Sequence, residues 1–207
     1  MNEKITLSEP PVIACFTPGT KIATLKGEVH VAKLCAGDKV VTRDNGIQEI
    51  RWVGSKKIDW RVMTAYPHLK PVLVRQGSLG NDLPERDLMV SPNHRVLVAN
   101  DRTALQFDEP EVLVAAKHLI GGNLVRSIDS IGTTYIHFMF DRHEVVLSDG
   151  IWTESFQPTD ATLKGFGNSQ RAEIFEIFPD LQTDEGRAGF RAARKTLTRN
   201  EASVLVE

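Results

Sequence analysis

A cysteine near the start of the chain, Cys15, has the residue type and the surroundings of a nucleophile. It follows the stretch PPVIA, and Pro18-Gly19 forms a turn signal directly before a strand-like segment. A thiol attacks as its thiolate, so a reactive cysteine needs a nearby base or positive charge. Two other interpretations remain open: Cys15 is a small apolar core residue, or it forms a disulfide with Cys35. Cys35, in AKLCAGDKV, precedes a turn, and we interpret it as structural.

The histidines are the natural candidates for a base or acid beside such a thiol. His137 and His143 flank the segment HFMFDRH, and in a strand both would share one face with Asp141. The spacing matches no tight metal-ligand motif, so we expect no metal here, and we expect His137 to be structural. Three more histidines are interpreted as surface residues: His30, His68 and His118.

Short segments rich in Val, Ile and Thr recur every 8–12 residues or so up to residue 158, which predicts a mainly β domain. The predicted strands are 21–25, 38–43, 47–53, 72–76, 87–90, 95–99, 123–128, 133–140, 144–148 and 151–156.

Turn residues separate these segments. Asn45-Gly46 and Asp149-Gly150 can adopt the positive φ angles of two-residue hairpin turns. Gly121-Gly122 marks a third reversal of the chain, and the Gly- and Asp-containing segment 77–86 is predicted to be a loop.

The periodicity changes after Pro158, which predicts a short helical C-terminal tail. Ile174, Ile177, Phe178 and Leu181 follow the helical spacing i, i+3, i+4, i+7, with Pro179 ending the regular part.

Three further features of the tail are predicted. Asn168 or Ser169 is expected to cap the first helix. A second helix is expected over 186–197, with Phe190, Ala193 and Leu197 on one face and the basic residues of RAGFRAARKTLTR on a solvated face. Thr198 and Glu201 have the spacing of a capping box for a last helix over 199–206.

The composition excludes several classes of protein. The 207 residues include 25 Lys+Arg and 27 Asp+Glu, a net charge of −2, so the basic footprint of a nucleic-acid-binding protein is missing. No apolar run is long enough for a membrane span, and the first residues have no apolar core of a signal peptide. Two cysteines are too few for a disulfide framework. The chain therefore has the composition of an ordinary globular protein.

Three motifs, in this order, carry a resemblance to a known family. CFTPGTKIATLKGEVHVAKLCAGDKVVT resembles the opening of the Hint domain, the fold shared by inteins and the Hedgehog autoprocessing domain. LMVSPNHRVLV is similar to the family's T-x-x-H motif, with Ser91 in the threonine position and His94 as the histidine. HEVVLSDGIWTES resembles the closing block of inteins, where His143, Asp149 and Gly150 fit.

The resemblance implies a compact β fold over residues 15–158, preceded by a leader, 1–14, and followed by the helical tail, 159–207. It implies a single-turnover self-cleavage in which the Cys15 thiol attacks the Ala14 carbonyl, an N-to-S acyl shift. His94 would be the general acid at the Cys15 nitrogen, Ser91 would hold the same peptide unit, and His143 would lie near Cys15.

The substrate is then the chain's own N-terminal segment. Water or a small nucleophile would be the acceptor of the acyl group, and no cofactor is expected. A sterol acceptor is not implied, because the tail contains no recognisable sterol site.

The closing motif departs from the intein pattern where splicing needs a histidine followed by an asparagine. Those positions are Glu154 and Ser155. Serine cannot form the succinimide by which asparagine cleaves its own backbone, so we expect cleavage at Ala14–Cys15 without splicing.

Two other functions remain open. A non-catalytic Hint-fold binding or structural module would explain why only 14 residues precede Cys15. A cysteine protease acting on other proteins is compatible with an early cysteine and a later histidine, but no flanking protease signature is present.

Overall fold

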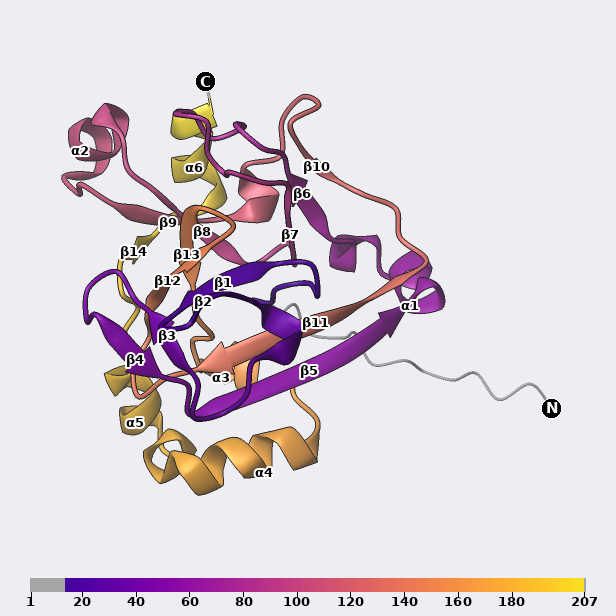
Figure 1. Ribbon diagram of the computed structural model, residues 1–207, viewed down its shortest axis with the longest axis vertical. Helices are drawn as coiled ribbons and strands as arrows, with labels where there is room; N and C mark the ends of the chain where they lie inside the picture. Colours follow the sequence, from indigo (N-terminus) through magenta and orange to yellow (C-terminus); the bar gives the residue numbers. More distant parts are fainter. Residues whose placement is uncertain (1–13, 207) are drawn as a thin grey trace.

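The computed structural model describes residues 14–206, which fold mainly into β-strands, with helices concentrated after residue 159 (Figure 1). This is the expected fold class. The strands are β1 (Lys21–Thr24), β2 (Gly27–His30), β3 (Lys39–Val41), β4 (Ile47–Glu49), β5 (Trp52–Asp59), β6 (Val72–Val74), β7 (Leu88–Val90), β8 (Arg95–Val98), β9 (Val112–Ala115), β10 (Val125–Ser127), β11 (Gly132–Met139), β12 (Val145–Ser148), β13 (Ile151–Glu154) and β14 (Lys195–Thr196).

The helices are mostly short. The α-helices are α1 (Trp60–Ala65), α2 (Asp101–Phe107), α3 (Asp160–Leu163), α4 (Asn168–Ile177), α5 (Asp184–Gly189) and α6 (Arg199–Val206), and the 3-10 turns are η1 (Val31–Lys33), η2 (Pro67–Leu69), η3 (Ala116–His118) and η4 (Pro179–Gln182). No helix among residues 14–206 has the length and apolar character needed to cross a membrane.

The largest sheet has the order β14-β9-β8-β13-β12-β1-β3-β4, with β2 paired to β1, and smaller sheets have the orders β10-β6-β7 and β11-β5. Every predicted strand segment contains a strand. The prediction missed β2, β9 and β14, and it joined β4 and β5, which the chain separates at Ile50 and Arg51. Ile50 is buried and its N–H donates to the Asp38 carbonyl, whereas β5, which follows, pairs with β11 in a separate sheet.

Strands β5 and β11 form a long antiparallel arm, paired from Gly132 opposite Asp59 to Met139 opposite Trp52 (Figure 1). Within it, Gly54 lies opposite His137. This pairing fixes His137 in register, which matters for the site described below.

The predicted turn at Asp149-Gly150 is confirmed: these residues have φ angles of 46° and 86° between β12 and β13. The two-residue turn predicted at Asn45-Gly46 is wrong in detail. Gly46 has φ 64°, but Asn45 has no positive φ, and residues 42–46 connect β3 and β4. Gly121 bridges Val125 at the third reversal, and no strand or helix interrupts residues 77–86.

Two apolar clusters hold the fold together. The larger cluster lies among the strands of the sheets and includes Phe16, Phe138 and Leu197. The second cluster contains Cys15 and Trp52 together with tail residues such as Phe166 and Ile174. Burial of such side chains is the main favourable contribution to folding, so the tail is part of the folded unit.

The first tail helix is confirmed as α4, which ends at Ile177 just before Pro179. Its predicted side-chain cap is wrong: Gly167 occupies the N-cap position, and no side chain caps the helix. The expected last helix is confirmed as α6, and the Thr198 N–H donates to the Glu201 carboxylate at 2.8 Å.

The second predicted helix is wrong beyond Gly189. Residues 195–196 form β14, which pairs in parallel with β9, and Leu197 is buried in the larger cluster. Arg194 bonds the carboxylates of Asp44 and Glu111. Tertiary contacts therefore override the local helical spacing, and the basic residues do not form one solvated helical face.

Candidate active site

Cys15 is placed by a short backbone segment inserted between two strands. The N–H of Phe16 donates to the Ile136 carbonyl at 2.7 Å, and Phe16 also bridges Val90 at the end of β7. Cys15 therefore lies between Ser91, which follows β7, and His137, which follows Ile136 in β11. Its side chain is 3% exposed.

Ser91 binds the main chain of Cys15 from both sides. The Cys15 N–H donates to Ser91 Oγ at 2.8 Å, and the Ser91 N–H donates to the Cys15 carbonyl at 2.9 Å. The nitrogen of the Ala14–Cys15 peptide is therefore fixed by the serine that occupies the threonine position of the sequence motif.

His137 lies directly beside the thiol, with its Nδ1 3.3 Å from Cys15 Sγ. The interpretation of His137 as a merely structural residue is therefore inadequate. The alternation of side chains along a strand could have indicated this contact. In the strand segment YIHFM, His137 lies on the same face as Tyr135 and Met139 and on the opposite face from Ile136 and Phe138. His143 and Asp141 are not on this face, because β11 ends at Met139.

The Cys15–His137 pair is uncharged at neutral pH. Burial, and then the charge of Glu154, raise the pKa of the Cys15 thiol well above its usual range. Burial lowers the pKa of His137 to about 3, and Lys56 contributes in the same direction. A neutral imidazole next to an un-ionised thiol can accept the thiol proton through Nδ1.

His94 is the second buried histidine of the site. Its N–H donates to the Ser91 carbonyl, so both residues lie on one turn, and its ring packs 4.3 Å from that of Phe16 between centroids. Among the described residues, neither ring nitrogen has a hydrogen-bond partner. Burial lowers the pKa of His94 to about 4.

His143 is held away from Cys15 by other partners. Its Nδ1 accepts from the Ala193 N–H at 2.9 Å, so the ring proton must be on Nε2, which lies 3.2 Å from both the Ser155 carbonyl and the Glu154 carboxylate. The structure thus brings Ser91 and His137 into contact with Cys15 but does not bring His143 there.

Glu154 and Ser155 are firmly integrated into the protein. Glu154 accepts from the Arg95 N–H at 2.8 Å and from Arg95 Nη1 at 2.9 Å. Ser155 Oγ accepts from the Glu144 N–H at 2.9 Å. The main chain continues through Phe156, whose N–H donates to the Phe138 carbonyl.

Tail residues close the thiol side of the site. Phe166 lies 4.8 Å from the His137 ring between centroids, and Trp52 and Phe156 pack against the same imidazole. The tail therefore supplies part of the apolar surroundings that keep the thiol and the imidazole uncharged.

The remaining candidates are resolved simply. Both cysteines are free and Cys35 is exposed, so the described structure contains no Cys15–Cys35 disulfide. Residues 14–206 hold no cluster of three or more acidic, histidine or cysteine side chains suited to a metal. His30 and His68 are exposed as expected, but His118 is partly buried.

Solved structures with a similar fold are inteins and intein-like domains. An intein-like domain from Clostridium thermocellum is 15% identical, with a TM-score of 0.44 over 68% of this chain and 97% of that one. A DnaB intein from Synechocystis is 11% identical, with a TM-score of 0.44 over 69% of this chain and 98% of that one. The Ssp DnaB mini-intein variant M86 is 10% identical, with a TM-score of 0.46 over 71% of this chain and 97% of that one.

None of the curated proteins matches this chain in sequence. A protein-family model described as the Hint domain matches residues 14–160, well over half of the chain. The match begins one residue before Cys15 and includes Ser91, His94, His137 and His143. The chain belongs to the Hint domain family.

Proposed function

We propose that this domain cleaves its own Ala14–Cys15 peptide bond through an N-to-S acyl shift, without splicing. Membership of the Hint family favours autoprocessing chemistry in general. The observation that carries the specific proposal is the Cys15 environment: a histidine nitrogen 3.3 Å from Sγ and a serine oxygen 2.8 Å from the nitrogen of the same residue.

The first step moves the Ala14 acyl group from nitrogen to sulfur. Neutral His137 accepts the thiol proton as Sγ attacks the Ala14 carbonyl carbon. The C–N bond then breaks, and the Cys15 nitrogen takes a proton from protonated His94. His137 returns its proton to solvent, so one S–H proton is lost and one amine proton is gained. Water or a small nucleophile releases the fragment ending at Ala14.

The residues at the end of the domain support cleavage without splicing. Splicing requires a side-chain amide that attacks its own backbone, and Ser155 has only a hydroxyl. That hydroxyl accepts the Glu144 N–H, and Glu154 is held by Arg95 and His143. The position where an intein has its terminal asparagine therefore carries no side-chain amide that could cleave the backbone.

The proposal is tested by fusing a soluble reporter upstream of residue 10 and treating the protein with hydroxylamine, which cleaves thioesters. Mass spectrometry should find a reporter fragment ending at Ala14, converted to its hydroxamate. Cys15→Ala should give no such fragment. If the parent gives none either, or if Cys15→Ala matches the parent, the proposal is wrong.

Gly54 offers a test of how His137 is positioned. A Cβ at this position would lie 2.5 Å from His137 Nε2 and would also clash with the Trp52 ring. Gly54→Ala should therefore displace the imidazole from Sγ, slowing thioester formation about tenfold or more, and should lower the free energy of unfolding by about 1–3 kcal/mol.

The matched control for Gly54→Ala is Gly189→Ala, where nothing lies within 4 Å of the added Cβ. Reporter release and urea unfolding should be measured on both variants. An unchanged rate in a folded Gly54→Ala protein would show that the position of His137 does not limit the reaction.

One observation favours a second candidate function, a non-catalytic Hint-fold module: the Cys15 thiol is buried and un-ionised. In that case hydroxylamine would release nothing, yet the parent would remain folded. The same burial disfavours a protease acting on other proteins, because the thiol side is closed by the Trp52, Phe156 and Phe166 rings.

A further inference from the structure

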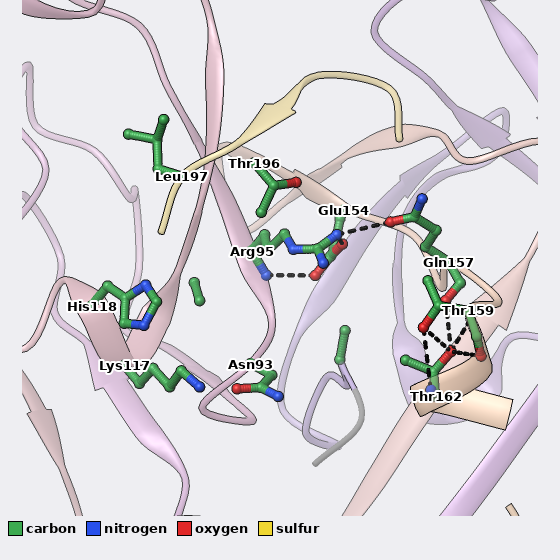
Figure 2. A pocket seen from close by; sticks show the side chains of 12 residues that line it. Asn93, Arg95, Lys117, His118, Glu154, Gln157, Thr159, Thr162, Thr196 and Leu197 are labelled. Atoms are coloured by element: carbon green, nitrogen blue, oxygen red, sulfur yellow. Dashed lines mark hydrogen bonds and ion pairs between the residues drawn. The ribbon is translucent and has the colours of Figure 1, made fainter. Parts of the chain in front are cut away.

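A small cavity opens beside Ala14, and Cys15 is not among the residues that line it. Its volume is about 210 Å³, and Ala14 forms part of its wall. Figure 2 shows the lining residues, with Arg95 and Glu154 in the middle of the view, Lys117 and His118 on the left, and Thr159 and Thr162 on the right.

We propose that this cavity, the Ala14 cavity, binds the acceptor nucleophile and that it prefers small acceptors carrying an anionic group. This inference rests on the proposed function and names the acceptor class that the reaction uses. The acceptor must reach the carbonyl carbon of Ala14, because that carbon carries the thioester.

The direction of approach follows from what surrounds Cys15. The Sγ side lies in the cluster that includes Trp52, Phe156 and Phe166. The Ala14 cavity, by contrast, is open, and its lining combines hydroxyl, amide and charged groups with the side chains of Ala115 and Leu197. An acceptor entering through it reaches Ala14 without displacing the apolar cluster.

The size of the cavity limits the acceptor. Ligand pockets for drug-sized molecules usually hold about 300–1,000 Å³, and a water molecule occupies roughly 30 Å³ in the liquid. A cavity of about 210 Å³ therefore fits a molecule of a few heavy atoms with some water.

The charges of the lining favour an anionic acceptor. The only carboxylate among the lining residues, that of Glu154, is already held by Arg95 and His143. Lys117 is exposed at the cavity and forms no side-chain hydrogen bond or ion pair within the described structure. Arg95 and Lys117 carry two positive charges and Glu154 carries one negative charge, so the lining has a net charge of +1. Because Arg95 is paired with Glu154, the unpaired positive charge is that of Lys117.

The transfer step is a thioester exchange. With a thiol acceptor, the acyl carbon of Ala14 forms a bond to the acceptor sulfur and loses its bond to Cys15 Sγ. The acceptor gives up its S–H proton and Cys15 regains one, so no oxidant or other reactant is needed.

Three thiols that differ mainly in charge provide the test: 3-mercaptopropionate, 2-mercaptoethanol and cysteamine. For each thiol, the rate at which it releases the reporter from the upstream fusion is divided by its rate of reaction with a free peptide thioester. This division corrects for the intrinsic reactivity of the thiol. We expect 3-mercaptopropionate to exceed 2-mercaptoethanol by about fivefold at low salt, with cysteamine slowest, and a smaller difference in 1 M salt.

Lys117→Met should remove the preference for 3-mercaptopropionate over 2-mercaptoethanol, because it removes the positive charge that we expect to attract the anionic acceptor. Lys26→Met, at an exposed lysine in the β1–β2 turn, is the matched control and should retain the preference. Thr196→Phe, which fills the cavity from β14, should slow all three thiols.

The outcomes separate the two proposals. No hydroxylamine-sensitive product in the parent would refute the self-cleavage itself. Hydroxylamine release with equal corrected rates for the three thiols, or a preference that persists in Lys117→Met, would leave the self-cleavage intact and refute the acceptor site.

Discussion

Replacing His94 with alanine is expected to slow thioester formation at Cys15 by about 10²–10⁴-fold at pH 7, the range of a lost general acid, while the protein stays folded. The reason is the position of the imidazole: it is buried, it shares a turn with the serine that holds the Cys15 nitrogen, and neither of its ring nitrogens has a hydrogen-bond partner among the described residues. The rate is measured by stopping the reaction at intervals and treating with hydroxylamine.

The pH dependence distinguishes His94 from a merely structural residue. Because burial lowers the pKa of His94 to about 4, only about one molecule in a thousand carries the acid at pH 7. His137, with a pKa of about 3, stays neutral throughout this range. The rate should therefore rise about tenfold for each unit that the pH falls between 7 and 5.

The control for this experiment is His30→Ala, because His30 is exposed at the end of β2. That variant should keep both the rate and its pH dependence, whereas His94→Ala should lose both. A rate that rises with pH in the parent would instead indicate attack by a thiolate formed without His94. Full cleavage in His94→Ala would remove this residue from the mechanism.

The sequence predicted those parts of the fold that depend on local patterns. The hairpin at Asp149-Gly150 and the cap of α6 at Thr198 each depend on a few neighbouring residues, and both are observed. β9 was missed because its sequence, VLVA, is buried throughout and has no alternation. Residues 190–197 were predicted as helix because the partners that hold them extended, β9 and Glu111, are more than 80 positions earlier in the chain.

Of the residues that contact Cys15, the sequence predicted the one that lies in a short motif and not the one that depends on strand pairing. Ser91 was assigned to the Cys15 peptide from its motif, and it bonds that nitrogen. The contact between His137 and Cys15 was missed because it depends on the register of β5 and β11 and on the insertion of Phe16 beside Ile136. Neither of these long-range pairings can be read from residue types, whereas the short spacing between Ser91 and His94 can.

The buried carboxylate of Glu154 connects the main sheet with the C-terminal segment. Its carboxylate is 1% exposed and is approached by Arg95 from β8 and by His143 from the loop before β12. His143 in turn accepts the N–H of Ala193 in the tail. A single carboxylate therefore connects the main sheet, the closing motif and the C-terminal segment, and its removal leaves several donors without a partner.

Glu154→Ala is therefore expected to lower the free energy of unfolding by about 3–5 kcal/mol, the usual cost of breaking a buried ion pair from one side. Urea unfolding measures this directly. Glu176→Ala, at an exposed carboxylate of α4, should change the free energy by less than about 0.5 kcal/mol. If Glu154→Ala does not fold, the isosteric Glu154→Gln should still fold and show a smaller loss.

The difference in the free energy of unfolding between the parent and Glu154→Ala should also depend on pH, in a direction set by the pKa of Glu154. Burial alone would raise the pKa of Glu154, but the hydrogen bond from His143 and the charge of Arg95 bring it below its ordinary value. A carboxyl group with a lower pKa in the folded state stabilises the fold fully above its unfolded pKa and loses that contribution as the pH falls through the folded one. The deficit of the variant should therefore be largest near neutral pH and shrink in acid. A deficit that is constant with pH, or one below about 1 kcal/mol, would mean that Glu154 contributes through its shape and not through its charge.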